Sequence, residues 1–117
     1  MTAETCPFCD LSKRVTQWTL LNTYLRVWAV EPLNPVVKGH TLIVPEDHVT
    51  SAIDAPHVTG YVMEQASLFA ARFDSANIIT SIGRPATQSV FHLHIHVVPR
   101  AANDGLALPW YSGKSKR

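Results

Sequence analysis

The sequence has only two cysteines, almost no net charge and no long apolar run. Two cysteines are too few for the disulfide framework of a small secreted protein. The formal net charge of +1 excludes the strongly basic surface on which nonspecific nucleic-acid binding depends. No apolar run approaches the roughly 20 residues of a membrane-spanning helix, and the N-terminus shows no signal-peptide pattern. We therefore expect a cytoplasmic protein without a nucleic-acid or membrane partner.

The length and composition are those of an ordinary globular chain. The chain has 117 residues, of which 46% are apolar and 16% charged, so it can bury a core. No repeat, low-complexity tract or long linker divides it. We expect a single domain over residues 1–117, with a short basic tail at about 112–117 to which we assign no function.

The residue pattern predicts five strands and one substantial helix. Four apolar residues spaced by four, seven and four positions predict a helix from Pro56 to about Ser75: Val58, Val62, Phe69 and Phe73. The predicted strands are 15–21, 24–31, 40–44, 76–82 and 89–98, with the first two forming a hairpin around Asn22. Mostly short connections favour an α+β fold with a mainly antiparallel sheet and one long helix over one face.

The last predicted strand carries three histidines at alternate positions, His92, His94 and His96. Because side chains on a strand alternate between its faces, the three imidazoles are expected on one surface. A single histidine is usually structural, but half of the chain's six histidines in strict alternation favour a functional site. The outer two backbones would stand about 13 Å apart, too far for three imidazoles to reach one metal easily through bonds near 2 Å. The three histidines should therefore divide their roles.

The run His-Leu-His-Ile-His-Val-Val at 92–98 resembles the signature of the histidine-triad, or HIT, superfamily of nucleotide hydrolases and transferases. The resemblance covers nearly the whole chain, including residues 6–9, 34–45, 88–89 and 104–110. It is closest to the zinc-containing, bacterial-type branch. It implies a HIT-like fold and a homodimer in which two protomers join their sheets into a continuous one.

The resemblance also implies a catalytic role for four residues. His94 would attack the α-phosphorus of a nucleoside phosphoramidate or dinucleoside polyphosphate and briefly carry the nucleotidyl group. A neutral imidazole is suited to this two-step displacement, and an ordinary pKa near 6.5 leaves enough of it at physiological pH. His96 would hydrogen-bond the phosphate or bridging atom, while Gln88 and Ser89 would donate to phosphate oxygens. No catalytic metal is required.

The pair Cys6-Pro7-Phe8-Cys9 by itself is consistent with a metal knuckle, a redox motif or two free thiols. In relatives that carry Cys-x-x-Cys, the first histidine of the triad completes a structural zinc site. The resemblance therefore implies zinc ligands at Cys6, Cys9, His48 and His92, a donor set that suits tetrahedral zinc. His40 and His57 are expected to be structural or exposed.

Contacts to the base and the ribose are implied by family register alone. A flat apolar slot for the base would use Phe8, Leu11 and Trp28, each of which is also a candidate for the core. Pro32 stands where the family usually has a ribose-binding acidic or amide residue, so this role would move to Glu31. Two more differences concern the phosphate region: Ser81 replaces a usual asparagine and Thr87 a frequent glycine.

Alternatives to this reading make different predictions. A noncatalytic nucleotide-binding or interaction module would bind nucleotide without forming an adduct on His94. A metal-dependent β-barrel oxygenase needs a third ligand, often a carboxylate, soon after the His-x-His pair, and residues 97–100 offer none. The tail suggests a further hypothesis, that Trp110 and Tyr111 reach the partner's site and help to select the leaving group.

Overall fold

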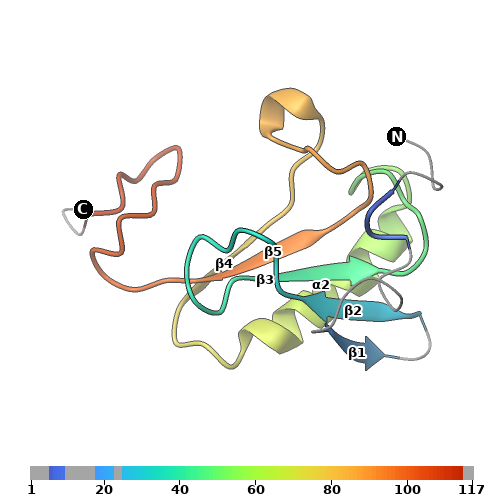
Figure 1. The fold of residues 1–117 in the computed structure, drawn as a ribbon, viewed down its shortest axis with the longest axis horizontal. Coiled ribbons are helices and arrows are strands. Elements are labelled where there is room, and N and C mark those ends of the chain that lie inside the picture. The colour runs from blue at the N-terminus through green and yellow to red at the C-terminus, as the bar shows by residue number, and fades with distance from the viewer. Residues whose placement is uncertain (1–5, 10–17, 23–24, 115–117) are drawn as a thin grey trace.

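The structure, a computed structural model, describes residues 6–9, 18–22 and 25–114. An antiparallel sheet is covered on one face by a helix, and the C-terminal segment extends beyond the end of β5 (Figure 1). The strands are β1 Trp18–Asn22, β2 Val27–Val30, β3 Thr41–Pro45, β4 Ala76–Ile79 and β5 Ile95–Pro99. The helix is α2 Pro56–Ala70, and a single 3₁₀ turn, η2, spans Arg84–Ala86. The predicted α+β class is confirmed.

The sheet order is β1-β2-β3-β5-β4, and each neighbouring pair is antiparallel. The alternation of side chains along the strands gives the sheet two buried surfaces. One packs against α2 through residues that include Val27, Ile43 and Ile95, all with no exposed area. The opposite surface buries Trp28, Val30, Leu42 and Val44. Since His96 alternates with the buried Ile95 and Val97, it lies on the face opposite α2.

The helix begins where the sequence predicted but ends earlier. Pro56 occupies the first turn, where a missing backbone N–H costs nothing, and Ala55 is the N-cap. α2 ends at Ala70 rather than near Ser75, because 71–75 form the tight turn that leads the chain into β4. The N–H of Phe73 donates to the carbonyl of Ala70 in this turn. No helix in the described part of the chain is long and apolar enough to cross a membrane.

The strand predicted at 89–98 is wrong at its start, because β5 begins only at Ile95. β3 pairs with β5 from Thr41 to Ile43 and then continues beside β2 alone. Before β5, the chain instead contacts the loop that follows β3, where the N–H of Leu93 donates to the carbonyl of Val49 at 2.6 Å. Only His96 of the three histidines therefore lies in a strand of the sheet, although His94 contacts both His92 and His96.

Candidate active site and metal centre

Two cysteines and two histidines from three distant segments meet at one end of the sheet. Cys6 and Cys9 come from the N-terminal segment, His48 from the loop after β3, and His92 from the segment before β5. One ligand atom from each lies within 4.8 Å of the others. Cys6 Sγ is 3.3 Å from His92 Nδ1, and Cys9 Sγ is 3.0 Å from His48 Nδ1. Tetrahedral bonds of about 2.3 Å to sulfur and 2.0 Å to nitrogen put such atoms about 3.5 Å apart, so the cluster is suited to zinc.

The surroundings of the cluster also favour a cation. Burial, together with the neighbouring Cys6, raises the pKa of the Cys9 thiol to about 11, so two adjacent thiolates need a positive charge to form. Burial lowers the pKa of His92 to about 4, which keeps its imidazole in the neutral form that binds metal. His92 Nε2 donates to the carbonyl of Pro45 at 2.7 Å and so leaves Nδ1 facing the sulfurs. The predicted structural zinc site is supported on each of these grounds.

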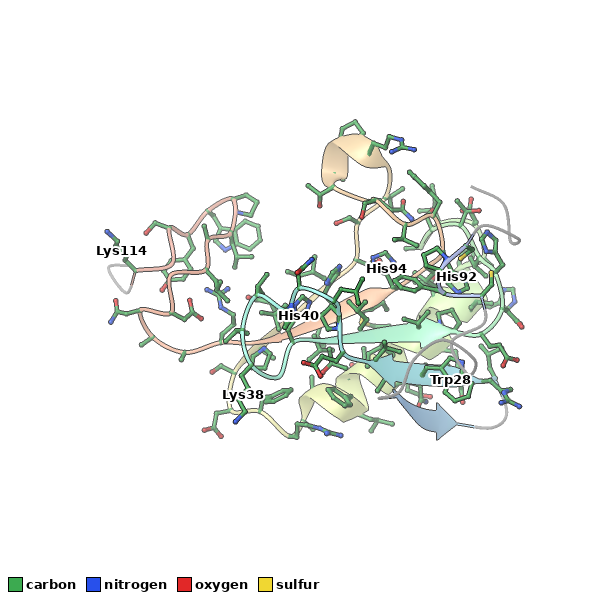
Figure 2. The ribbon with its side chains drawn as sticks, viewed as in Figure 1. Trp28, Lys38, His40, His92, His94 and Lys114 are labelled. Atoms are coloured by element: carbon green, nitrogen blue, oxygen red, sulfur yellow. The ribbon has the colours of Figure 1, made fainter. Side chains whose placement is uncertain are left out.

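His94 lies between His92 of the metal centre and His40 (Figure 2). Its Nδ1 is 2.8 Å from the carbonyl of His92, and a carbonyl only accepts, so Nδ1 carries the proton. The lone pair is therefore on Nε2. Burial lowers the pKa of His94, which keeps this nitrogen unprotonated at neutral pH. The hydroxyl of Thr80 donates to the His94 carbonyl at 2.8 Å and fixes the backbone at this point.

His96 has the opposite tautomer, and a residue that the sequence analysis left outside the site determines it. The backbone N–H of Val36 donates to His40 Nδ1 at 3.1 Å, so the proton of His40 is on Nε2. His40 Nε2 lies 2.9 Å from His96 Nδ1 and donates to it. The His96 proton is then on Nε2. The rings of His94 and His96 are 5.2 Å apart between centroids, so the ring with an unprotonated Nε2 and the ring with an Nε2–H group are neighbours.

Of the two expectations for His40, structural or exposed, the second is wrong: His40 is buried, and it is hydrogen-bonded to His96 of the triad. The signal that could have found it is strand register. Leu42 pairs with His96 across β3 and β5, and His40 is two positions before Leu42, on the same face. His57, by contrast, is exposed in the first turn of α2, as expected.

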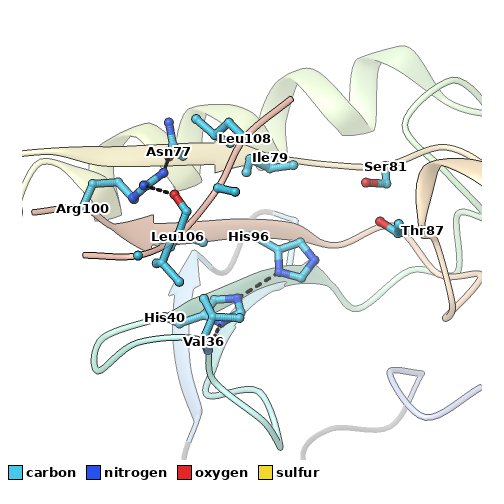
Figure 3. Close-up of a pocket in the computed structure, with 13 residues that line it drawn as sticks. Val36, His40, Asn77, Ile79, Ser81, Thr87, His96, Arg100, Leu106 and Leu108 are labelled. Carbon is cyan, nitrogen blue, oxygen red and sulfur yellow. Dashed lines mark hydrogen bonds between the residues drawn. The ribbon is translucent and has the colours of Figure 1, made fainter. Parts of the chain in front are cut away.

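A cavity of about 350 Å³ adjoins His96 on the open face of β4 and β5 (Figure 3). His40 and His96 line one part of it, with the hydroxyl residues Ser81 and Thr87 nearby. Residues 105–108 of the C-terminal segment form another wall. The prediction that Ser81 belongs to the substrate region is consistent with this position.

Comparisons with known proteins agree with the geometry. The HIT domain family model matches residues 15–103. The chain belongs to the HIT family. An uncharacterized HIT-like protein of Borreliella burgdorferi is 33% identical over 110 residues, which cover 86% of this chain and 78% of that protein. Adenosine 5'-monophosphoramidase HNT1 of Saccharomyces cerevisiae is 28% identical to this chain over 110 residues, which cover 90% of this chain and 69% of the yeast protein.

A solved HIT structure resembles the chain closely enough to bear on the metal. The Zn-bound histidine triad family protein of Mycobacterium smegmatis superposes with a TM-score of 0.72 at 30% identity, covering 92% of this chain and 83% of that one. A relative of similar fold therefore binds zinc. Together with the four converging donors of this chain, this confirms the zinc-containing branch of the HIT family.

The two neutral donors expected from the HIT pattern are placed differently. Gln88 is buried, and its side-chain nitrogen donates to the carbonyls of Thr50 and Val90, at 2.8 and 3.1 Å. Its oxygen accepts from the N–H of Gly83 at 2.8 Å. The side chain thus holds the loop before His92, and its donors are turned to backbone rather than to phosphate. Ser89 is exposed in that loop.

The residues expected to hold base and ribose are only partly brought together. The Phe8 ring lies 5.2 Å from the His94 ring between centroids, edge to face, and packs on the buried cluster around Trp28. Trp28 is 1% exposed, so it supports Phe8 from the core and offers no open face for stacking. Glu31 is exposed just after β2 and has no described contact with the histidines. Leu11 lies outside the described residues.

Proposed function

We propose that this HIT protein cleaves nucleotides at the α-phosphorus through a covalent nucleotidyl-His94 intermediate. The observation that carries the proposal is the pair of opposite tautomers on His94 and His96. A backbone carbonyl fixes one, and a backbone N–H acting through His40 fixes the other. An imidazole lone pair and an imidazole N–H at one place are what displacement at phosphorus requires.

In the first step, His94 Nε2 would attack the phosphorus and form a P–N bond. The bond from phosphorus to the leaving atom breaks, and the leaving atom departs with the electron pair, takes a proton from solvent and becomes the free amine. His96 Nε2–H would donate a hydrogen bond to that atom as negative charge develops on it. In the second step, water attacks phosphorus, the P–N bond breaks, and its electron pair returns to His94. A nucleoside monophosphate and a proton are released.

The proposed roles of the remaining residues are positional. Gln88 would hold the loop that carries Ser89, and Ser89 would donate to a phosphate oxygen from its exposed position. Phe8, supported by Trp28, would contact the base, with Leu11 beside it, while Glu31 would bind the ribose. The zinc centre would fix the backbone around His92 and thereby the carbonyl that orients His94. Zinc supplies structure there rather than a reacting group.

The name of the yeast relative supports a phosphoramidate as substrate. It is called an adenosine 5'-monophosphoramidase, and the match covers most of this chain. A small nucleotide also suits the near-neutral chain better than a nucleic acid does. Dinucleoside polyphosphates are the other substrate class that the resemblance implies.

Intact-mass analysis after rapid mixing with adenosine 5'-phosphoramidate tests the proposal. We expect a transient adenylyl adduct in the native protein, its loss in His94→Ala, and its retention in the matched control His57→Ala, whose histidine is exposed on α2. An adduct that persists in His94→Ala would refute the assignment of the nucleophile. Binding of AMP without any adduct or product would favour the noncatalytic binding module instead.

We also propose that the chain, as a single cytoplasmic domain over residues 1–117, forms a homodimer through β4. β4 is an edge strand of the sheet, and Ile79 on β4 and Leu68 on α2 are 37% and 67% exposed. Pairing of two β4 edges would cover such apolar surface and give a continuous sheet. Sedimentation at micromolar concentration checks this, because a protein that stays monomeric there would contradict it. Cell fractionation checks the location.

A further inference from the structure

Phe8 lies between the two cysteines of the metal centre and connects them with the triad. The N–H of Cys9 donates to the carbonyl of Cys6, which closes a tight turn, and the N–H of Phe8 donates to Cys6 Sγ, each at 3.4 Å. The Phe8 ring lies edge to face against His92, at 6.0 Å between centroids, and against His94, at 5.2 Å. One residue of the cysteine turn therefore contacts both a histidine of the metal centre and the proposed nucleophile.

The metal donors lie at both ends of this turn. Cys6 Sγ is 3.3 Å from His92 Nδ1, and Cys9 Sγ is 3.0 Å from His48 Nδ1. An ion bound by all four groups would fix the main chain on either side of Phe8. It would also strengthen the hydrogen bond from the Phe8 N–H, because a metal-bound sulfur is a thiolate and an ionised acceptor makes a stronger hydrogen bond. Zinc would therefore restrict the positions that Phe8 can take.

Phe8 is half-buried, so part of its side chain stays open to a ligand. The rest packs on the buried cluster of Trp28, Val30, Leu42 and Val44. In the proposed function Phe8 contacts the base of the nucleotide, and the following inference rests on that contact. A base laid against Phe8 would limit the movement of the same residue that zinc restricts through the cysteines. When two ligands order one residue, each makes the binding of the other easier, and the effect is reciprocal.

We infer that zinc binding and nucleotide binding are coupled through Phe8, so that each ligand raises the affinity of the protein for the other. Zinc remains a structural ion, and the metal centre supplies no reacting group. Coupling between two sites typically changes an affinity by about 5- to 150-fold, and we expect about tenfold here. The hydrogen bond from His94 Nδ1 to the carbonyl of His92 is a second connection between the two sites, which the experiment separates from Phe8.

The experiment measures the Kd of the full-length, zinc-loaded protein for zinc by competition with a chromogenic chelator, with and without AMP. We expect saturating AMP to lower this Kd about tenfold. Ribose 5-phosphate carries the sugar and the phosphate but no base, so at the same concentration it should change the Kd by less than about twofold. It also controls for binding of zinc by the phosphate itself. A decrease equal to that with AMP would show that the base is not needed, and it would overturn the role of Phe8.

Phe8→Ala removes the ring and leaves both cysteines in place, and Ile53→Ala is the matched control. Ile53 is another large apolar residue close in sequence to a metal donor, His48, but its side chain is 65% exposed. With AMP saturating for each variant, we expect the zinc Kd to fall less than about twofold in Phe8→Ala and about tenfold in Ile53→Ala. Phe8→Leu keeps an apolar side chain on the buried cluster and decides the matter if Phe8→Ala does not fold. Its AMP effect should be at most about a third of that in Ile53→Ala.

An AMP effect of native size in Phe8→Ala, or in Phe8→Leu where that variant decides, would assign the coupling to the hydrogen bond between His92 and His94 and overturn the role of Phe8. An unchanged zinc Kd in native protein that binds AMP would overturn the coupling altogether. In both cases, formation of the adenylyl-His94 adduct would leave the proposed function intact. Absence of both AMP binding and the adduct would overturn the proposed function, and the coupling with it. Calorimetric titration of AMP and mass analysis of the adduct therefore separate the two failures.

Discussion

His40 Nε2 lies 2.9 Å from His96 Nδ1, and this contact connects the loop before β3 with the last histidine of the triad. The other nitrogen of His40 accepts from the N–H of Val36. Because an N–H only donates, the whole chain of hydrogen bonds has one direction and ends in a proton on His96 Nε2. In the proposed mechanism His40 would be a positioning residue, since it contacts His96 and would act through it rather than on the substrate.

Replacing His40 should slow the reaction without abolishing nucleotide binding. We expect His40→Ala to lower kcat for phosphoramidate cleavage by about 10- to 100-fold, the range typical of lost support for a reacting side chain, with a smaller change in KM. His40→Gln should recover part of the rate, because its amide can accept from Val36 and donate to His96. Steady-state kinetics of both variants, beside His57→Ala, check this.

A purely structural role for His40 would give a different result. His40→Ala and His40→Gln would then lower kcat in proportion to lost stability, and Gln would give no rescue in folded protein. A value of kcat for His40→Ala within twofold of native would rule out the positioning role altogether.

The activity should persist at mildly acidic pH. Burial, followed by the nearby His94 and His40, lowers the pKa of His96 to about 4, and burial also lowers that of His94. Both proposed roles use neutral imidazoles, so a lowered pKa moves the loss of activity to lower pH. A histidine with the ordinary pKa of about 6.5 would be only about 10% neutral at pH 5.5.

We therefore expect kcat/KM to fall by clearly less between pH 7 and pH 5.5 than the roughly tenfold loss of an ordinary histidine, and to fall further as the pH approaches 4. A pH profile measured with zinc present throughout checks this. Zinc content is determined at each pH as the control, since protons compete with zinc for its ligands. A tenfold fall between pH 7 and 5.5 with zinc retained would show that the histidines titrate normally.

Removal of zinc should destabilise the protein and inactivate it together. The metal centre joins the N-terminal segment, the loop after β3 and the segment before β5, so its loss frees the backbone that orients His94. We expect chelation or Cys9→Ser to lower Tm by about 10 °C, which corresponds to roughly 2–3 kcal/mol in a domain of this size. Calorimetry with zinc analysis checks the change, and His57→Ala serves as the control.

A redox role for Cys6 and Cys9 predicts the reverse combination. Thiol alkylation would then abolish turnover in a protein that keeps its native Tm. If a chelator instead removes activity and stability together, and added zinc restores both, the redox role is excluded.

The sequence was most informative where the chemistry depends on local pattern. The alternating histidines and the Cys-x-x-Cys pair carried the resemblance, and the resemblance rather than the local pattern supplied the zinc ligands, His48 included. The predicted start of the last strand was wrong because alternation indicates only which face a side chain takes. A strand also needs a neighbouring strand with which its backbone can hydrogen-bond. His40 was missed for the related reason that its role depends on the register between β3 and β5, which no local pattern encodes.

Gln88 shows a third kind of limit. A polar residue next to the triad has the right chemistry for phosphate, but its side chain is engaged by three backbone groups once the loop folds. Such competition between ligand and backbone is decided by geometry. Residue type alone could not predict which of the two Gln88 would bind.

Thr87 provides a test of backbone strain in the same loop. Its φ of +77° is left-handed, a region that a β-branched residue enters at a cost of about 1–2 kcal/mol. Glycine takes this conformation without that cost but gives the unfolded chain more freedom, worth about 0.4–1 kcal/mol. We expect Thr87→Gly to raise the free energy of unfolding by up to about 1 kcal/mol, as measured by urea denaturation.

Thr50→Gly is the matched control, because Thr50 is also an exposed loop threonine but has a negative φ. At position 50 glycine adds freedom to the unfolded chain but relieves no backbone strain in the folded one. The free energy of unfolding should therefore fall by about 0.5–1 kcal/mol. Equal destabilisation by the two glycines would show that the loop relaxes around Thr87 and stores no strain. Opposite signs would show that the threonine is held there at a cost in stability, as is common for residues that line a functional site.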